Sequence, residues 1–187
     1  MPADHENVVA LVEAAQRKRK PNTGRVYADF ADPVAAAHSI VARDYMDGDL
    51  RTLQAWQSEF YVWQGAHYAV LPLADLRARL YEIGPSCSDK PVKRASVDNV
   101  VDALRGVANL SHLSVPTVPA WTPAPDGAVP ASADPDPRQL IPLRNGLLSI
   151  NDSALLPVTP RYFTTFSLPF DYTANAEEPG AWLAFLA

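Results

Sequence analysis

The stretch that decides the fold spans residues 50–71 and reads LRTLQAWQSEFYVWQGAHYAVL. Aromatic and aliphatic residues gather there in three short runs, at residues 50–56, 59–63 and 67–71, and runs of this kind favour β-strands. Gln64-Gly65 offers turn chemistry between the second and third runs. The stretch therefore predicts a three-stranded antiparallel meander.

Helices are predicted on both sides of this meander. Asp32-Pro33 supplies an N-cap followed by proline at the first helical position, so we expect a helix from Pro33 to about Tyr45. After the meander, apolar residues recur at helical spacing over residues 73–83. Gly84-Pro85 is expected to end that helix, because proline disrupts a helix interior.

The clearest helical pattern begins at Ser96 and is expected to end near Leu110, with valine and leucine on one stripe and charged residues opposite. Residues 116–137 then contain seven prolines. Because proline donates no backbone hydrogen bond, this segment is expected to be an extended linker, with Trp121 docked on another part of the chain.

Strand character returns after the proline-rich segment. Short apolar runs occur at residues 139–143, 147–150 and 154–156. Asn145-Gly146 is a tight-turn signal between the first two runs, and Asn151-Asp152 separates the second from the third. These residues predict a second small antiparallel meander.

The whole pattern predicts an α+β protein in four parts. The parts are an N-terminal helix and basic segment at residues 1–31, an α+β core module at 32–115, a proline-rich linker at 116–137, and a β-meander with the start of a helix at 138–187.

The closing residues read as a helix cut off after about two turns. Its apolar face is unfinished and consists of Trp182, Leu183, Phe185 and Leu186. Apolar side chains left without a partner favour association with another surface. We therefore expect a truncated chain in which this face packs on a domain that the sequence lacks.

Composition narrows the class of protein. Of 187 residues, 48% are hydrophobic and 20% are charged, as in ordinary globular domains. Cys87 is the only cysteine, which excludes an intramolecular disulfide and a cysteine-based zinc site and favours a reducing cytoplasm. We expect no export signal and no membrane segment, because the N-terminus has no basic head and no window approaches 18 uninterrupted apolar residues.

A net charge of −5 argues against nucleic-acid binding over the whole surface. One dense cationic run remains, made of Arg17, Lys18, Arg19 and Lys20, with Arg25 shortly after it. The run is either a site for DNA phosphates, bound without sequence specificity, or a solvated helix end that complements the helix dipole. Lys90, Lys93 and Arg94 form a weaker second cluster.

No residue set predicts a catalytic centre, a metal site or a cofactor site. No glycine is followed by lysine, so the P-loop that cradles nucleotide phosphates is missing. The four histidines, His5, His38, His67 and His112, lack metal-ligand spacing.

Two further catalytic alternatives are weak. Cys87 is predicted in a loop after Gly84-Pro85, and no base is evident to activate it as a nucleophile. Asp47 and Asp49 flank a glycine in Asp-Gly-Asp, which is more typical of a turn than of a metal site. We therefore expect that this chain is not an enzyme.

Aromatic residues are concentrated in the first meander. They are Trp56, Phe60, Tyr61, Trp63 and Tyr68. Such a set serves either as a platform on which bases of a single strand stack or as part of the core. Core packing is the favoured interpretation, because a small sheet must bury one face to be stable.

Two parts of the chain together resemble a known family. The first comprises LQAWQSEFYVWQGAHY at 53–68 and LRARLY at 76–81. The second comprises IPLRNGLL at 141–148, LPVTPRYF at 156–163, LPFDY at 168–172 and WLAFL at 182–186. In order and spacing they are similar to the region that precedes the superfamily 3 helicase in phage and plasmid primase–helicases related to the poxvirus primase–helicase. The resemblance covers about residues 36–187.

The resemblance implies a role beside a motor rather than a catalytic activity. In that family a hexameric ATPase follows this region, and its Walker motifs and a primase site are missing here. The chain is expected to be a non-catalytic module that positions or regulates the motor on DNA, in the cytoplasm of a bacterium carrying a mobile element, with oligomerisation through the motor. The alternative is a stand-alone adaptor that binds a replication protein and has no affinity for DNA.

Overall fold

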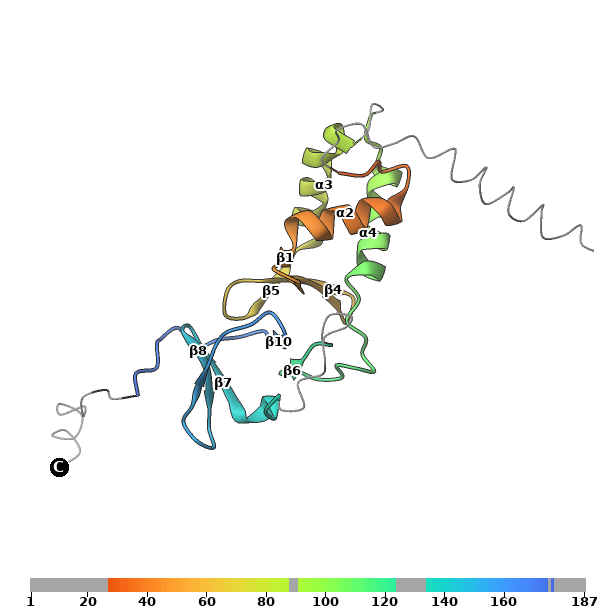
Figure 1. Cartoon of the computed structure of the whole chain (residues 1–187). Helices are drawn as coiled ribbons and strands as arrows, with labels where there is room; N and C mark the ends of the chain where they lie inside the picture. The colour runs from red at the N-terminus through yellow and green to blue at the C-terminus, as the bar shows by residue number, and fades with distance from the viewer. Residues whose placement is uncertain (1–26, 88–90, 124–133, 175, 177–187) are drawn as a thin grey trace, which may run out of the picture.

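The computed structural model describes residues 27–87, 91–123, 134–174 and 176 (Figure 1). Several predicted features lie outside these residues. They are the helix predicted near the N-terminus, the cationic residues Arg17, Lys18, Arg19, Lys20 and Arg25, and the apolar residues Trp182, Leu183, Phe185 and Leu186.

The described residues form an α+β fold, as predicted. The helices are α2 (Pro33–Asp44), α3 (Leu73–Cys87), α4 (Arg94–Val107) and the 3₁₀ turn η1 (Pro137–Gln139). The strands are β1 (Met46–Asp47), β2 (Leu50–Arg51), β3 (Leu53–Trp56), β4 (Glu59–Trp63), β5 (Tyr68–Leu71), β6 (Ala120–Trp121), β7 (Leu140–Leu143), β8 (Gly146–Ser149), β9 (Leu155–Leu156) and β10 (Tyr162–Phe163). None of the described helices is long and apolar enough to cross a membrane.

Both predicted meanders are present. Strands β3, β4 and β5 pair antiparallel in that order, and β7, β8 and β9 form a second antiparallel sheet. Two smaller pairings join the rest of the chain, β1 with β2 and β6 with β10. In Figure 1 the helices lie on one side of the first meander and the second meander lies on the other side.

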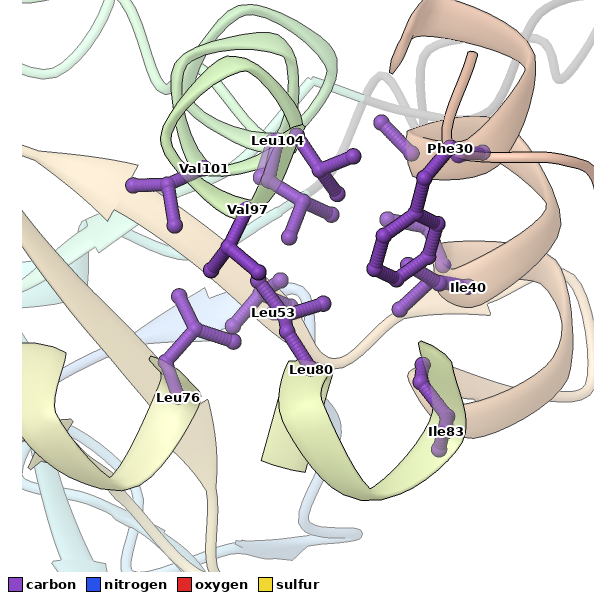
Figure 2. Close-up of a cluster of buried hydrophobic side chains, with 14 of the residues drawn as sticks. Phe30, Ile40, Leu53, Leu76, Leu80, Ile83, Val97, Val101 and Leu104 are labelled. Carbon is purple, nitrogen blue, oxygen red and sulfur yellow. The ribbon is translucent and has the colours of Figure 1, made fainter. Parts of the chain in front are cut away.

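Helices α2, α3 and α4 cover one face of the β3–β5 sheet. Leu53 of β3 lies in one buried cluster with Ile40, Leu80 and Leu104 from the helices (Figure 2). Phe60 of β4 belongs to the same cluster. The side chain of Asp32 accepts a hydrogen bond from the Ala35 amide at 3.0 Å, so α2 begins as its sequence predicts.

The opposite face of the sheet carries the aromatic residues. Trp56 and Tyr68 are buried there around Phe163, a residue of β10. The ring centroids of Tyr68 and Phe163 are 4.9 Å apart, and those of Trp56 and Phe163 are 5.6 Å apart. The favoured core interpretation therefore accounts for Trp56 and Tyr68 on this face, while Phe60 packs on the helix side.

The proline-rich segment contributes to this second cluster. Val118 and Ala120 pack against it, next to Val115, the fully buried residue that precedes the segment. Trp121 docks as expected: its indole nitrogen donates to the Pro135 carbonyl at 2.8 Å, and its ring packs edge-on against Tyr162. Phe163 thus packs directly on the first meander, across the linker that the sequence predicts.

The prediction that Gly84-Pro85 ends a helix is wrong. Helix α3 continues through Pro85 to Cys87, which is fully buried rather than in a loop. The Cys87 thiol donates to the Ile83 carbonyl at 3.1 Å, and a Cβ at Gly84 would meet Val92 at 2.5 Å. Packing of this last turn offsets the hydrogen bond that Pro85 cannot donate.

Other boundaries also differ from the prediction. Helix α4 begins at Arg94 and ends at Val107, so Ser96 lies inside it rather than at its cap. The first predicted strand is divided, because Arg51 pairs with Met46 while Leu53 pairs with Val62. The β7–β8 turn consists of residues 144 and 145, and Gly146 is already paired.

Candidate functional site

The described residues bring together a site that differs from the one predicted. A cleft of about 360 Å³ opens where the first meander meets the second half of the chain. It is lined by residues 49–51 and 54, by residues from 109 to 114 that follow α4, and by residues 122–123 and 160–161. The cleft is thus assembled from segments that are far apart in the sequence.

Arg51, at the end of β2, is the central charged group of the cleft. One terminal nitrogen of its guanidinium donates to the Val107 carbonyl at the end of α4. The other donates to Gln54 Oε1 at 3.0 Å and to the Asn109 carbonyl at 3.4 Å. Cations complement the negative end of a helix dipole, so these bonds fix the guanidinium and stabilise the end of α4.

No carboxylate of the described residues lies within 4.0 Å of Arg51. Its Nε is buried without a hydrogen-bond partner. Burial lowers the pKa of the Arg51 guanidinium from its ordinary value, yet an arginine remains charged in proteins. The cleft therefore holds a partly desolvated positive charge that no carboxylate of the described residues pairs with.

A buried phenol joins the two halves of the chain beneath Arg51. The Tyr68 hydroxyl donates to the Pro160 carbonyl at 2.7 Å and lies 3.3 Å from the Arg51 carbonyl. Burial raises the pKa of Tyr68 to about 12. The phenol therefore stays protonated at neutral pH and remains a hydrogen-bond donor.

Arg161 stands on the other side of the cleft, just before β10. Its guanidinium pairs with both carboxylate oxygens of Asp134 and stacks over the Trp121 ring at 5.5 Å from the centroid. Such a two-point pair fixes the plane of an arginine. Arg161 is therefore held in one orientation at the wall of the cleft.

The tip of the β7–β8 hairpin binds the segment that follows β10. Arg144 forms a two-point ion pair with Asp171, with bonds of 2.8 and 2.7 Å. The Asn145 side chain donates to the Tyr172 carbonyl at 2.9 Å and accepts from the Tyr172 amide at 3.0 Å. These contacts join two of the motifs that the sequence resemblance rests on, IPLRNGLL and LPFDY.

Within the described residues, the structure assembles neither a metal site nor a catalytic centre from the candidates of the sequence. There, no group of three or more His, Cys, Asp or Glu side chains is placed to hold a metal ion, and Asp47 and Asp49 are exposed on the β1–β2 hairpin. His67 Nδ1 lies 3.0 Å from Ser167 Oγ, which links β5 to the segment after β10.

The cleft is not predicted as a site by any sequence motif. Arg51 and Thr122 lie outside the motifs of the resemblance. Gln54 lies inside LQAWQSEFYVWQGAHY, and Pro160 and Arg161 lie inside LPVTPRYF, but nothing in the sequence groups them. The basic cluster at residues 17–25 lies outside the described residues and stays a prediction.

Comparison with known proteins identifies the family of the chain. A search of curated proteins finds no match to the chain. Residues 89–187, just over half of the chain, match the family described as D5 N terminal like. The match includes the second set of motifs and the Arg161 side of the cleft, while the motifs at 53–81 precede it. The chain therefore belongs to the D5 N terminal like family, the N-terminal region of D5-like primase-helicase proteins.

Proposed function

We propose that this chain is a non-catalytic module of a DNA primase-helicase that positions or regulates the helicase motor on DNA. The observation that carries the proposal is the family match over residues 89–187, which associates the chain with replication primase-helicases. The proposal extends that association to a mechanical role, in which the module contacts both the motor and the nucleic acid.

The packing of the matched region against the first half of the chain supports the proposal that the module acts as a rigid body. Helix α4, in the matched region, packs on α2 and α3, which precede the match. Phe163 of the matched region packs on Trp56 and Tyr68 of the first meander. Contacts of this kind transmit orientation, because packed apolar interiors resist deformation. A module built in this way suits the task of holding a motor at a fixed angle to DNA.

The proposed partners are DNA and the helicase ATPase domain. DNA would be held without sequence specificity by Arg17, Lys18, Arg19, Lys20 and Arg25. The motor would contact Trp182, Leu183, Phe185 and Leu186 and would bring the module into an oligomer. We place its action in the cytoplasm of a bacterial cell that carries a phage or plasmid.

The motor contact is tested with a D5-like primase-helicase motor, assayed with the chain joined to its N-terminal side or left out. We expect the chain to change the DNA-dependent rate of ATP hydrolysis or of strand separation. The double substitution Trp182→Ser and Phe185→Ser should remove this effect without unfolding the described residues. Equal motor rates with and without the chain would overturn the proposal.

The DNA contact is tested by fluorescence anisotropy with a labelled oligonucleotide at several salt concentrations. Each phosphate contact contributes about 0.9 to the log–log salt slope on duplex DNA and about 0.7 on a single strand. Changing Arg17, Lys18, Arg19 and Lys20 to Ala should flatten this slope. Motor regulation without any DNA binding would favour the adaptor alternative.

A further inference from the structure

The cleft beside Arg51 is large enough for one small ligand. Its volume of about 360 Å³ lies at the lower end of the range of ligand pockets, roughly 300–1,000 Å³. Leu50, Leu110, Pro123 and Pro160 are the apolar residues of its lining. One nucleotide unit fits such a cleft, whereas a double helix exceeds it.

The charge of the cleft points to an anion. Within the described residues, Arg51 is held by carbonyl and amide oxygens rather than by an acid, so none of these contacts neutralises its positive charge. A partly buried charge without a counter-charge is costly for the folded protein. A bound anion would supply the missing compensation.

The other lining groups favour a phosphate over a carboxylate. Ser111, Ser114 and Thr122, which carry hydroxyl groups, line the cleft together with Arg161. These residues come from different segments, and a tetrahedral group with several acceptor oxygens can accept from several donors. Arginines and hydroxyl groups are the usual partners of nucleic-acid phosphates.

Two acidic residues oppose anion binding, namely Asp134, which pairs with Arg161, and Asp49, which lines the cleft. Asp49 is exposed on the β1–β2 hairpin, where solvent screens its charge. Removing this charge should therefore strengthen the binding of an anion. The residue offers a substitution that changes the cleft without touching a buried contact.

We infer that this cleft binds the phosphate of one nucleotide unit, supplied by a single strand of DNA or by a free nucleotide. The inference deepens the proposed function and rests on it, because it assigns a second, enclosed contact to the nucleic acid. Arg51 binds the phosphate oxygens, together with the second N–H of each Arg161 terminal nitrogen, which the pair with Asp134 does not use. The apolar residues of the lining pack against the sugar or base.

The experiment measures anisotropy of a labelled oligothymidylate with the full chain. All variants carry Ala at residues 17–20, so that binding by the basic cluster does not mask the cleft. Arg161→Gln should weaken binding about tenfold, as expected for loss of a charged hydrogen bond, and should lower the salt slope by about 0.7. Asp49→Asn should tighten binding. Arg138→Gln is the matched control, because Arg138 is an exposed arginine on η1 outside the cleft lining.

Competition with thymidine monophosphate and with inorganic phosphate distinguishes the sources of the phosphate. Displacement at equal phosphate concentration assigns the cleft to free nucleotides, and displacement only by unlabelled oligothymidylate assigns it to a strand. The inference is overturned if no probe binds, or if Arg161→Gln and Asp49→Asn both behave like Arg138→Gln while their melting curves match the parent. The motor assay is independent of this outcome, so a failed cleft leaves the module role intact.

Discussion

Gly146 shows how a single residue sets the shape of the second meander. A Cβ at this position would lie 2.5 Å from Leu155 Cδ1 and 2.8 Å from the Leu156 carbonyl oxygen. The backbone of β8 therefore approaches β9 more closely than a side chain permits. The glycine is required for this approach rather than for the turn, which consists of residues 144 and 145.

Gly146→Ala should destabilise the protein by about 1–3 kcal/mol, the range for overpacked sites. Gly106→Ala is the matched control, because a Cβ at Gly106 in α4 meets nothing within 4 Å and alanine is the better helix former by about 0.5–1 kcal/mol. Urea unfolding of both variants measures the difference. Equal stability of the two would show that β9 gives way to the added methyl group.

The ion pair between Arg144 and Asp171 makes the hairpin tip sensitive to acid. The hydrogen bonds from Arg144 lower the pKa of Asp171 below its ordinary value. The pair therefore stabilises the folded state at pH values above the ordinary aspartate pKa of about 4, and this contribution is lost as the pH falls through the lower folded value.

Arg144→Ala should return the pKa of Asp171 towards the ordinary value, because the group that favours its ionised form is removed. The carboxyl chemical shift of Asp171, followed by NMR against pH, measures this change. Asp152, an exposed aspartate whose pKa is lowered by hydrogen bonds from Ser149 and Ala154, serves as the control and should not move. An unchanged Asp171 titration would contradict the ion pair.

At the scale of elements, the end of α3 shows that tertiary packing can extend a helix past residues that usually end one, here Gly84-Pro85. Pro85 removes one helix hydrogen bond, but the last turn buries Cys87 completely and places Gly84 against Val92. The core thus extends the helix past the residues that the sequence marks as its end.

The thiol of Cys87 should therefore react slowly with a thiol reagent in the native protein and rapidly in denaturant, because only opening of α3 exposes it. An exposed cysteine introduced by Ala42→Cys on α2, in a Cys87→Ala background, gives the reference rate for an accessible thiol. Similar native rates for the two thiols would place Cys87 in an open segment, as the sequence alone suggests.

At the scale of the whole molecule, the aromatic cluster beneath the first meander joins the two halves of the chain. Phe163 is fully buried between Trp56 and Tyr68, and Tyr68 also donates to the Pro160 carbonyl. The α+β core module and β10, which lie on either side of the predicted linker, therefore share apolar contacts. Tyr162 of β10 packs in turn with Leu140 and Leu147 of the second meander. We expect the core module and the second meander to unfold together in one cooperative transition.

Phe163→Ala should lower stability by about 3–5 kcal/mol, as for other buried aromatic residues, and should shift the whole transition. Phe166→Ala is the control, because Phe166 is 54% exposed and surface substitutions change stability by about 0.5 kcal/mol or less. Thermal unfolding followed by both circular dichroism and tryptophan fluorescence tests this. Two separate transitions in the parent chain would show that the halves fold independently.

Local chemistry in the sequence determined most of the elements. Asp32-Pro33 predicted the start of α2, and the short apolar runs predicted both meanders, because capping and the side-chain period of a strand act between neighbouring residues. The motifs in the second half likewise indicated the family. These features depend on contacts within a few positions of each other.

Three features were determined only by the tertiary structure. They are the length of α3, the requirement for glycine at position 146, and the cleft. Each depends on groups brought together from distant parts of the chain: Cys87 with the helical core, Gly146 with β9, and Arg51 with Arg161. Burial and close packing act over all neighbours in space. The spacing of residues along the chain does not specify those neighbours. The grouping of the cleft residues could therefore be recognised only in the folded protein.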